Sequence, residues 1–205
     1  MRTRLLLPAL LVVAIACSTQ PPMQDYVEGL TADRASKDEM FRAATDSPVP
    51  RQSADEFLPL AYYPIDESFR APAALAPFDA TLEPVLAMPT STGQIRQMQR
   101  AGVLQFSMHG ETRQLSAFVS ADDPGRRRLF VPFRDPTNGD ETYQAGRYLD
   151  LDRTATGLYD LDFNRAYQPY CYFDPAYDCP IPPRENRLET PIRAGERMRT
   201  VAVGP

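Results

Sequence analysis

Residues Leu129–Leu188 read LFVPFRDPTNGDETYQAGRYLDLDRTATGLYDLDFNRAYQPYCYFDPAYDCPIPPRENRL, and this stretch decides the fold. Apolar and polar side chains alternate along residues 129–133, 147–152 and 158–164. Such alternation is typical of strands that have one face in a core and the other in solvent. Clusters of Asp, Pro, Asn and Gly separate the runs and indicate turns. The stretch therefore predicts antiparallel strands, with 147–152 and 158–164 pairing as a hairpin.

The same alternation continues upstream of this stretch. Residues 103–109 alternate, the chain turns at His109-Gly110-Glu111-Thr112, and apolar residues recur on one face of the return strand at Leu115, Ala117 and Val119. Strands that follow one another in this way are typical of an antiparallel meander. Further short strands are expected at residues 68–71, 84–88 and 198–203.

Helical patterns occur only in front of the strands. Residues 25–44 carry an imperfect apolar stripe at helical spacing among many charges. Ser53-Ala54-Asp55-Glu56 has the spacing of a capping box and predicts a further short turn of helix. We therefore expect a mainly β fold, an antiparallel β-barrel or curved sandwich with an N-terminal helical segment.

The N-terminus has the pattern of an export signal. Arg2 and Arg4 precede an apolar run, 5–16, that is shorter than the about 20 residues needed to span a bilayer. Ala14-Ile15-Ala16-Cys17 resembles the junction at which bacterial lipoproteins are cut and lipidated. We expect a signal peptide over 1–16, a lipidated tether over 17–24 and one β-rich domain over 25–205. An ordinary secretory signal with a chance cysteine, or a single-pass anchor, are the alternatives.

These features predict an exported lipoprotein held on the periplasmic or outer side of a bacterial membrane. The 22 basic and 27 acidic residues give a formal charge of −5, and removal of Arg2 and Arg4 changes it to 20 minus 27, or −7. Nucleic acid as a partner is not expected, because phosphates require a basic footprint. The 21 prolines favour short elements and fixed turns.

An ordered series of short motifs runs through the second half of the chain: Pro132-Phe133-Arg134-Asp135, Gly139, Glu141-Thr142-Tyr143, Gly146-Arg147-Tyr148-Leu149-Asp150, Leu161-Asp162-Phe163-Asn164, Ala166-Tyr167, Pro169, Cys171, Cys179-Pro180, Pro182-Pro183, Asn186-Arg187-Leu188, Ile192 and Ala194-Gly195-Glu196. The series resembles the bacterial family catalogued as domain of unknown function 1684, most strongly over 128–197. It departs from that family before Gly146, where this chain has Gln144 and Ala145 in place of the usual glycines. The family has no established reaction, so the resemblance implies a domain and no activity.

Alternation places Arg147 on the same strand face as Leu149 and Leu151. If that face is the core, Arg147 is buried and requires a carboxylate partner. Glu141 is the nearest acid that is not on the outer face of the hairpin. The pair would either fix the loop 135–146 or form a clamp for an anionic ligand.

Residues Asp135–Glu141 are rich in oxygen ligands around a glycine, which suits Ca²⁺. Their spacing is not that of an EF-hand loop, and Asp-Pro-Thr-Asn-Gly is also good turn chemistry. We expect a turn here, no metal site and no cofactor.

Acids could also support catalysis. Glu141 and Asp162 are the pair to test for general acid–base hydrolysis. The single histidine, His109, sits at a tight turn, which argues against a nucleophile–histidine arrangement.

Cys171 and Cys179 are the only thiols left if Cys17 carries lipid. In an oxidising compartment a disulfide is the expected state, worth about 2.5 kcal/mol by loop closure. A redox-active pair is the alternative, and zinc would need more ligands than the chain has.

The leading hypothesis is an envelope-anchored module that binds a small ligand or a protein partner between the 135–147 loop and the 165–187 segment. Tyrosines around a polar pocket suit such recognition. The competing hypothesis is a hydrolase of an envelope substrate. The predicted ligand-binding residues are Asp135, Glu141, Tyr143, Arg147, Asp162, Asn164 and Tyr167.

Overall fold

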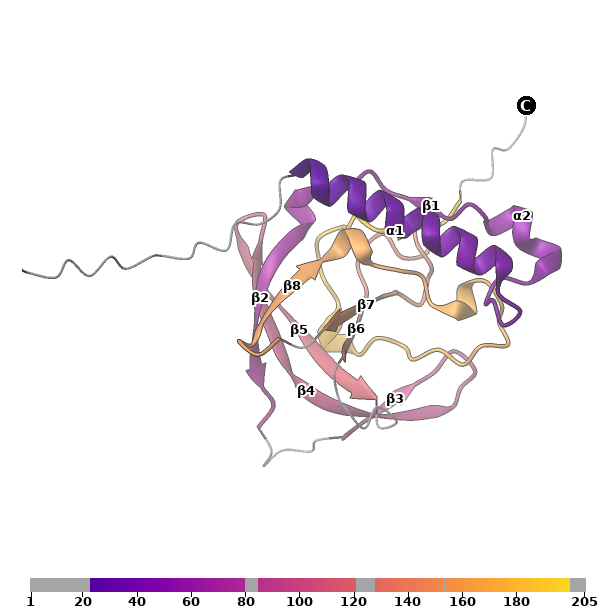
Figure 1. The fold of residues 1–205 in the computed structure, drawn as a ribbon. Coiled ribbons are helices and arrows are strands. Elements are labelled where there is room, and N and C mark those ends of the chain that lie inside the picture. The colour runs from indigo at the N-terminus through magenta and orange to yellow at the C-terminus, as the bar shows by residue number, and fades with distance from the viewer. Residues whose placement is uncertain (1–22, 80–84, 121–127, 153, 200–205) are drawn as a thin grey trace, which may run out of the picture.

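The computed structural model describes residues 23–79, 85–120, 128–152 and 154–199, and it is mainly β with a helix at its N-terminal end (Figure 1). The helices are α1 Met23–Ala43 and α2 Ala54–Phe57. The strands are β1 Ala61–Tyr62, β2 Arg70–Pro77, β3 Val85–Pro89, β4 Ile95–Met108, β5 Glu111–Ser120, β6 Arg128–Phe133, β7 Arg147–Asp152, β8 Leu158–Asp162 and β9 Glu196–Arg197.

A curled antiparallel sheet forms the body of the protein. Within the described residues it has seven strands, in the order β7-β6-β5-β4-β2-β8, with β3 also paired to β4. The sheet curls until it is nearly closed, and α1 lies across one end of it (Figure 1). The predicted barrel-like β fold and the predicted N-terminal helix are therefore confirmed.

β4 is long and serves two parts of the sheet. Its second half pairs with β2, whereas its first half, from Ile95 to Gln99, pairs with β3. The register with β5 shifts between Arg100 and Gly102. A Cβ at Gly102 would lie 2.3 Å from the carbonyl oxygen of Ala76, so only glycine allows this close approach. Before this shift, residues 95–99 of β4 pair with β3 and no longer with β2, and we call them the β4 extension.

The core follows the alternation predicted from sequence. Inward-facing side chains of six strands are buried together inside the curled sheet, among them Leu104, Leu115, Val131, Leu149 and Leu161. α1 contributes Tyr26, Leu30 and Phe41, which are buried along one side of the helix. At the β4–β5 connection, His109 (φ 52°) and Gly110 (φ 80°) have the positive angles of the tight turn predicted there, and His109 is exposed.

The predicted hairpin between 147–152 and 158–164 is not formed. β7 pairs with β6, from Phe133↔Arg147 to Arg128↔Asp152, and β8 pairs with β2, from Arg70↔Asp162 to Ala74↔Leu158. β8 pairs with the edge of β2 over five residue pairs. β7 and β8 therefore lie at opposite ends of the strand order of the sheet.

Alternation would put Asp162 and Asn164 on the outer face of their strand with Asp160, but the structure does not leave them in solvent. Both are buried, because α1 covers the end of β8 and the Tyr26 hydroxyl donates to Asp162 at 2.8 Å. Ser53 precedes α2 as expected, but its side chain makes no capping hydrogen bond. The expected final strand falls mainly outside the described residues, and β9 precedes it, paired with β1.

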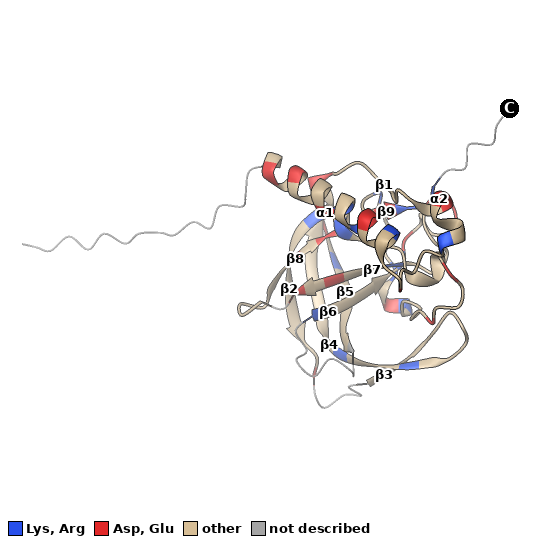
Figure 2. Ribbon diagram, turned by 45° about the vertical axis from the view of Figure 1, so that its right-hand side comes forward, with Lys and Arg blue, Asp and Glu red and all other residues tan. Residues whose placement is uncertain are grey.

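Acidic and basic residues are interspersed over the ribbon, including along α1 (Figure 2). No helix among the described residues combines the length and apolar character needed to cross a membrane. The expected signal peptide, the lipidation site Cys17 and nearly all of the tether lie outside the described residues.

Candidate functional site

Arg147 is fully buried, as alternation predicted, and it holds the C-terminal segment against the barrel. Its guanidinium donates to the carbonyl oxygens of Ile192 (2.6 Å), Ala194 (2.6 Å) and Glu196 (3.1 Å). The fourth hydrogen bond, at 2.9 Å, goes to the carboxylate of Asp135. The prediction that Glu141 is the partner was wrong.

Asp135 is the better placed acid because it lies two residues after the end of β6, where Phe133 pairs with Arg147 at the start of β7. Its buried carboxylate accepts hydrogen bonds from Arg147, from the backbone N–H of Ile192 at 3.1 Å and from Thr137 through both backbone N–H and hydroxyl. All its bonding capacity is used inside the protein. The cluster therefore acts as a structural clasp for the 135–146 loop and residues 192–196.

Glu141 lies at the surface of this loop. Arg193 donates to it with two nitrogens, at 2.7 and 3.0 Å, and the Tyr63 hydroxyl donates at 3.0 Å. The hydrogen bonds from Arg193 lower the pKa of the Glu141 carboxyl. An acid held ionised in this way is poorly suited to donate a proton at neutral pH.

Asp162 is engaged by a separate set of partners. It accepts from the Tyr26 hydroxyl and from both the backbone and the side chain of Asn164 at 3.0 Å. Asn164 in turn bonds both backbone groups of Asp66, at 2.8 and 3.0 Å. Glu141 and Asp162 share no partner among the described residues, and each carboxylate is already engaged by its own donors.

Cys171 and Cys179 are both buried and lie side by side, but no disulfide joins them. The backbone N–H of Cys171 donates to the sulfur of Cys179 at 3.1 Å. The segment is held without a covalent bond: Tyr172 and Phe173 close a 3₁₀ turn, and Tyr143 packs against Tyr172 with ring centroids 5.7 Å apart. The predicted disulfide is therefore absent from this structure.

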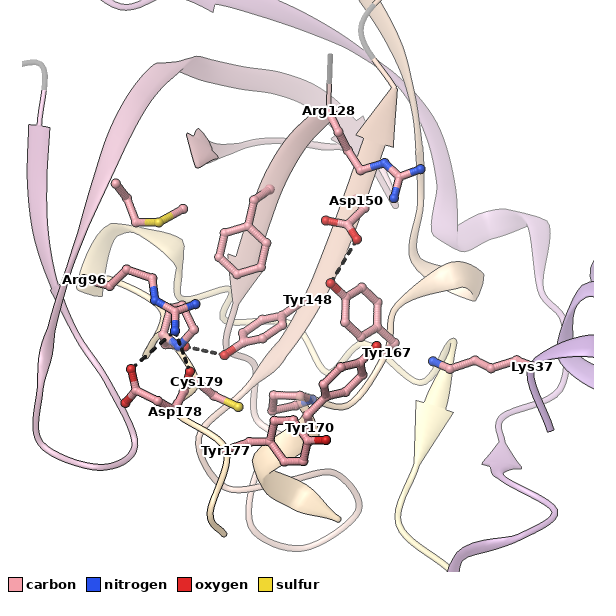
Figure 3. Close-up of a pocket in the computed structure, with 14 residues that line it drawn as sticks. Lys37, Arg96, Arg128, Tyr148, Asp150, Tyr167, Tyr170, Tyr177, Asp178 and Cys179 are labelled. Atoms are coloured by element: carbon pink, nitrogen blue, oxygen red, sulfur yellow. Dashed lines mark hydrogen bonds and ion pairs between the residues drawn. The ribbon is translucent and has the colours of Figure 1, made fainter. Parts of the chain in front are cut away.

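A pocket of about 770 Å³ lies on the outer face of β6 and β7 (Figure 3). Because Arg147, Leu149 and Leu151 face the core, the alternate residues Tyr148 and Asp150 face outward. The extension of β4 and the segment 167–180 stand around these residues. The full lining is Lys37, Arg96, Met98, Arg128, Phe130, Tyr148, Asp150, Tyr167, Pro169, Tyr170, Tyr177, Asp178, Cys179 and Pro180.

Aromatic rings make up much of the wall. Tyr148 packs against Phe130 and Tyr167, with ring centroids 4.8 and 5.7 Å apart, and Tyr170 packs against Tyr177 at 5.4 Å. The segment is anchored because Tyr148 and Tyr167 exchange two backbone hydrogen bonds of 3.0 Å, and the Tyr148 hydroxyl donates to the carbonyl of Pro180 at 2.5 Å. The pocket is thus built on hydrogen bonds to the free edge of β7.

The basic residues of the lining are paired with acids. The distance from nitrogen to carboxylate oxygen is 2.6 Å for Lys37 Nζ and Glu196. It is 3.3 Å for Arg96 Nη2 and Asp178, and 3.5 Å for Arg128 Nε and Asp152. The Lys37 ammonium also lies 5.0 Å from the centroid of the Tyr167 ring, within cation–π range. Lys37 is the single lysine of the chain.

Asp150 differs from these groups. Its carboxylate accepts one hydrogen bond, from the Tyr167 hydroxyl at 3.0 Å, and no cation of the described residues lies within ion-pair distance. Its side chain is accessible from the pocket, while the surrounding protein raises its pKa by burial. Figure 3 shows Asp150 and Tyr167 on one side of the pocket, and Arg96 with Asp178 on the other.

Of the seven predicted ligand-binding residues, the structure places only Tyr167 in this pocket. Asp135 and Arg147 form the clasp, Glu141 lies at the surface, Asp162 and Asn164 lie under α1, and Tyr143 packs beside the cysteines. Sequence reasoning missed Tyr148 and Phe130. They occupy outward positions on β6 and β7, and two large aromatic residues at positions assigned to solvent were the available signal.

The comparisons agree with this fold. The protein of unknown function family DUF1684 matches residues 55–197. The solution NMR structure of an uncharacterized protein from Haloarcula marismortui is 37% identical, with a TM-score of 0.66, and the match covers 85% of this chain and 95% of that one. No curated protein is significantly similar. The chain belongs to the DUF1684 family of proteins of unknown function.

Proposed function

We propose that this protein is a cell-envelope lipoprotein whose pocket on the outer face of β6 and β7 binds a small organic ligand. The observation that carries the proposal is the pocket itself: about 770 Å³, lined by five aromatic rings and a few polar groups. Small-molecule sites have this size and composition.

The alternative of a hydrolase using Glu141 and Asp162 receives no support from the geometry. Each carboxylate is already bonded to tyrosine, arginine or amide partners, and neither lines the pocket. A protein partner is less favoured than a small ligand because the recognition groups are gathered around a hollow.

Filling the pocket should abolish ligand binding without unfolding the protein. Asp150→Trp places a large side chain in the pocket from an exposed strand position, and Leu158→Trp, at an exposed position on β8, is the matched control. A library of soluble small molecules is screened on the full chain by ligand-observed NMR. Hits should be lost with Asp150→Trp and kept with Leu158→Trp. Hits that survive Asp150→Trp would show that the site lies elsewhere.

Export and anchoring are a second part of the proposal, supported by the apolar run before Ala14-Ile15-Ala16-Cys17. Cys17→Ser removes the thiol that would receive lipid. We expect the variant to lose its acyl mass and either to leave the membrane fraction or to stay uncut. Fractionation with intact-mass measurement checks this, and Cys171→Ser serves as the control cysteine. Unchanged processing and membrane retention of Cys17→Ser would refute the anchor.

A further inference from the structure

Among the described residues of the pocket, one charged side chain, Asp150, has no partner of opposite charge. Lys37, Arg96 and Arg128 each form an ion pair with an acid. Asp178 is likewise paired, through Arg96. Asp150 has only the neutral Tyr167 hydroxyl as its partner among the described residues, although its carboxylate faces the pocket. The charge that a ligand could still neutralise is therefore negative.

We propose that the pocket binds an organic cation, an ammonium group carried on an apolar body, with the cationic group held between Asp150 and the tyrosine rings. This inference rests on the proposed function, because it names the class of ligand for the same pocket. A carboxylate beside several aromatic faces is the arrangement that attracts ammonium groups, since the ring faces carry partial negative charge.

The structure already contains one ammonium at such a face. Lys37 places its ammonium 5.0 Å from the centroid of the Tyr167 ring and 5.1 Å from that of Phe41. Its charge is satisfied by Glu196 at 2.6 Å, so it does not neutralise Asp150. Tyr167 therefore contacts both groups: its ring faces the Lys37 ammonium, and its hydroxyl donates to Asp150.

An anionic ligand fits less well. It would meet Asp150 and the negative faces of the rings, and it would have to draw Lys37 or Arg96 away from their acids. Arg128 is the loosest of the three cations, since its contact with Asp152 is 3.5 Å long and both side chains are exposed. It lies at the rim without an ion pair to Asp150. Burial raises the pKa of Asp150, and the Tyr167 hydrogen bond and the charges of Arg128 and Lys37 offset that rise only in part.

The volume of the pocket indicates that the ammonium is carried on a larger body. About 770 Å³ is much more than a trimethylammonium group fills, and Met98, Phe130 and Pro180 provide apolar wall beside the charged part. Pockets of this kind bury most of a ligand in apolar contacts and use few polar groups for orientation.

Choline and 3,3-dimethyl-1-butanol, its uncharged isostere, separate charge from shape. Titration calorimetry on the full chain should show choline binding at least about tenfold more tightly than the isostere. Asp150→Asn should reduce that preference to about threefold or less. Asp160→Asn removes an exposed acid of β8 outside the pocket and should leave the preference unchanged.

The rings are tested at Tyr170, which lines the pocket, is 43% exposed and packs against Phe41 with ring centroids 6.2 Å apart. Tyr170→Leu should weaken choline binding several-fold, while Tyr170→Phe, which keeps the ring, should restore it. Equal binding of choline and its isostere would overturn the cation proposal yet leave a ligand-binding pocket. The absence of choline binding, or tighter binding of benzoate than of choline, would also overturn it.

Discussion

Replacing Asp135 with asparagine should lower the free energy of unfolding by about 3–5 kcal/mol, the usual cost of removing one partner of a buried ion pair. Arg147 would stay fully buried with no carboxylate to balance it. Both Asp135 oxygens accept hydrogen bonds, one from Thr137 and the other from Arg147 and Ile192. In asparagine one of these oxygens becomes an NH₂ group, so in either orientation of the amide a donor faces another donor. The loss should therefore be near the upper end of the range.

Denaturant unfolding followed by circular dichroism measures the effect. Glu141→Gln is the matched control, because its ion pair with Arg193 is partly exposed at the surface. Exposed pairs contribute about 0–1 kcal/mol, so Glu141→Gln should change the stability little. If Glu141→Gln proved as costly as Asp135→Asn, Glu141 would be the acid that balances Arg147 in solution, and the clasp described above would be wrong.

The fold class followed from local patterns, whereas the strand pairing did not. Alternation correctly put Leu149, Leu161 and Arg147 toward the core. Successive side chains of a strand point to opposite faces, so the sequence of one strand is enough to assign its buried face. The pairing of β8 with β2 instead of β7 depends on how far the sheet curls. No local pattern encodes that curl. The short spacing between β7 and β8 in the sequence suggested a hairpin, but the two strands lie at opposite ends of the strand order.

The residues that line the pocket, apart from Tyr167, were not predicted, for a related reason. Asp135, Glu141, Arg147, Asp162 and Asn164 were conspicuous in the sequence because polar residues stood among apolar ones. In the structure these groups hold loops and helix α1 in place, which is the common use of buried polar groups. The pocket arises where segments distant in sequence, the β4 extension and residues 167–180, surround the outer face of β7. Alternation alone assigns that face to solvent.

Pro132 raises a second difficulty that only the tertiary structure resolves. A proline has no N–H to donate, and it is rarely found inside a central strand. β6 nevertheless lies between β5 and β7. β5 and β6 are registered at Phe118↔Phe130, so two residues further along Ser116 stands opposite Pro132. At Pro132 the hydrogen-bond ladder between β5 and β6 lacks an N–H donor, and the side chain of Asn186 lies between the two strands.

Asn186 supplies the missing hydrogen bonds. Its amide nitrogen donates to the carbonyl oxygens of Ser116 (2.8 Å) and Pro132 (2.7 Å), and its oxygen accepts from the backbone N–H of Ser116 at 2.7 Å. The side chain is fully buried, so water cannot take over these bonds. Asn186→Leu keeps the approximate volume and leaves three buried backbone groups unpaired.

Each unpaired buried group costs about 1–3 kcal/mol, and we expect Asn186→Leu to lower the free energy of unfolding by about 3–5 kcal/mol. The Ser116 amide should also exchange its hydrogen faster, which a general loss of packing would not single out. Glu185→Gln is the control, since Glu185 is exposed and pairs at the surface with Arg100. An unchanged denaturation midpoint for Asn186→Leu, with the Ser116 amide still protected, would mean that β5 and β6 close without this side chain. The proline in a central strand would then need another explanation.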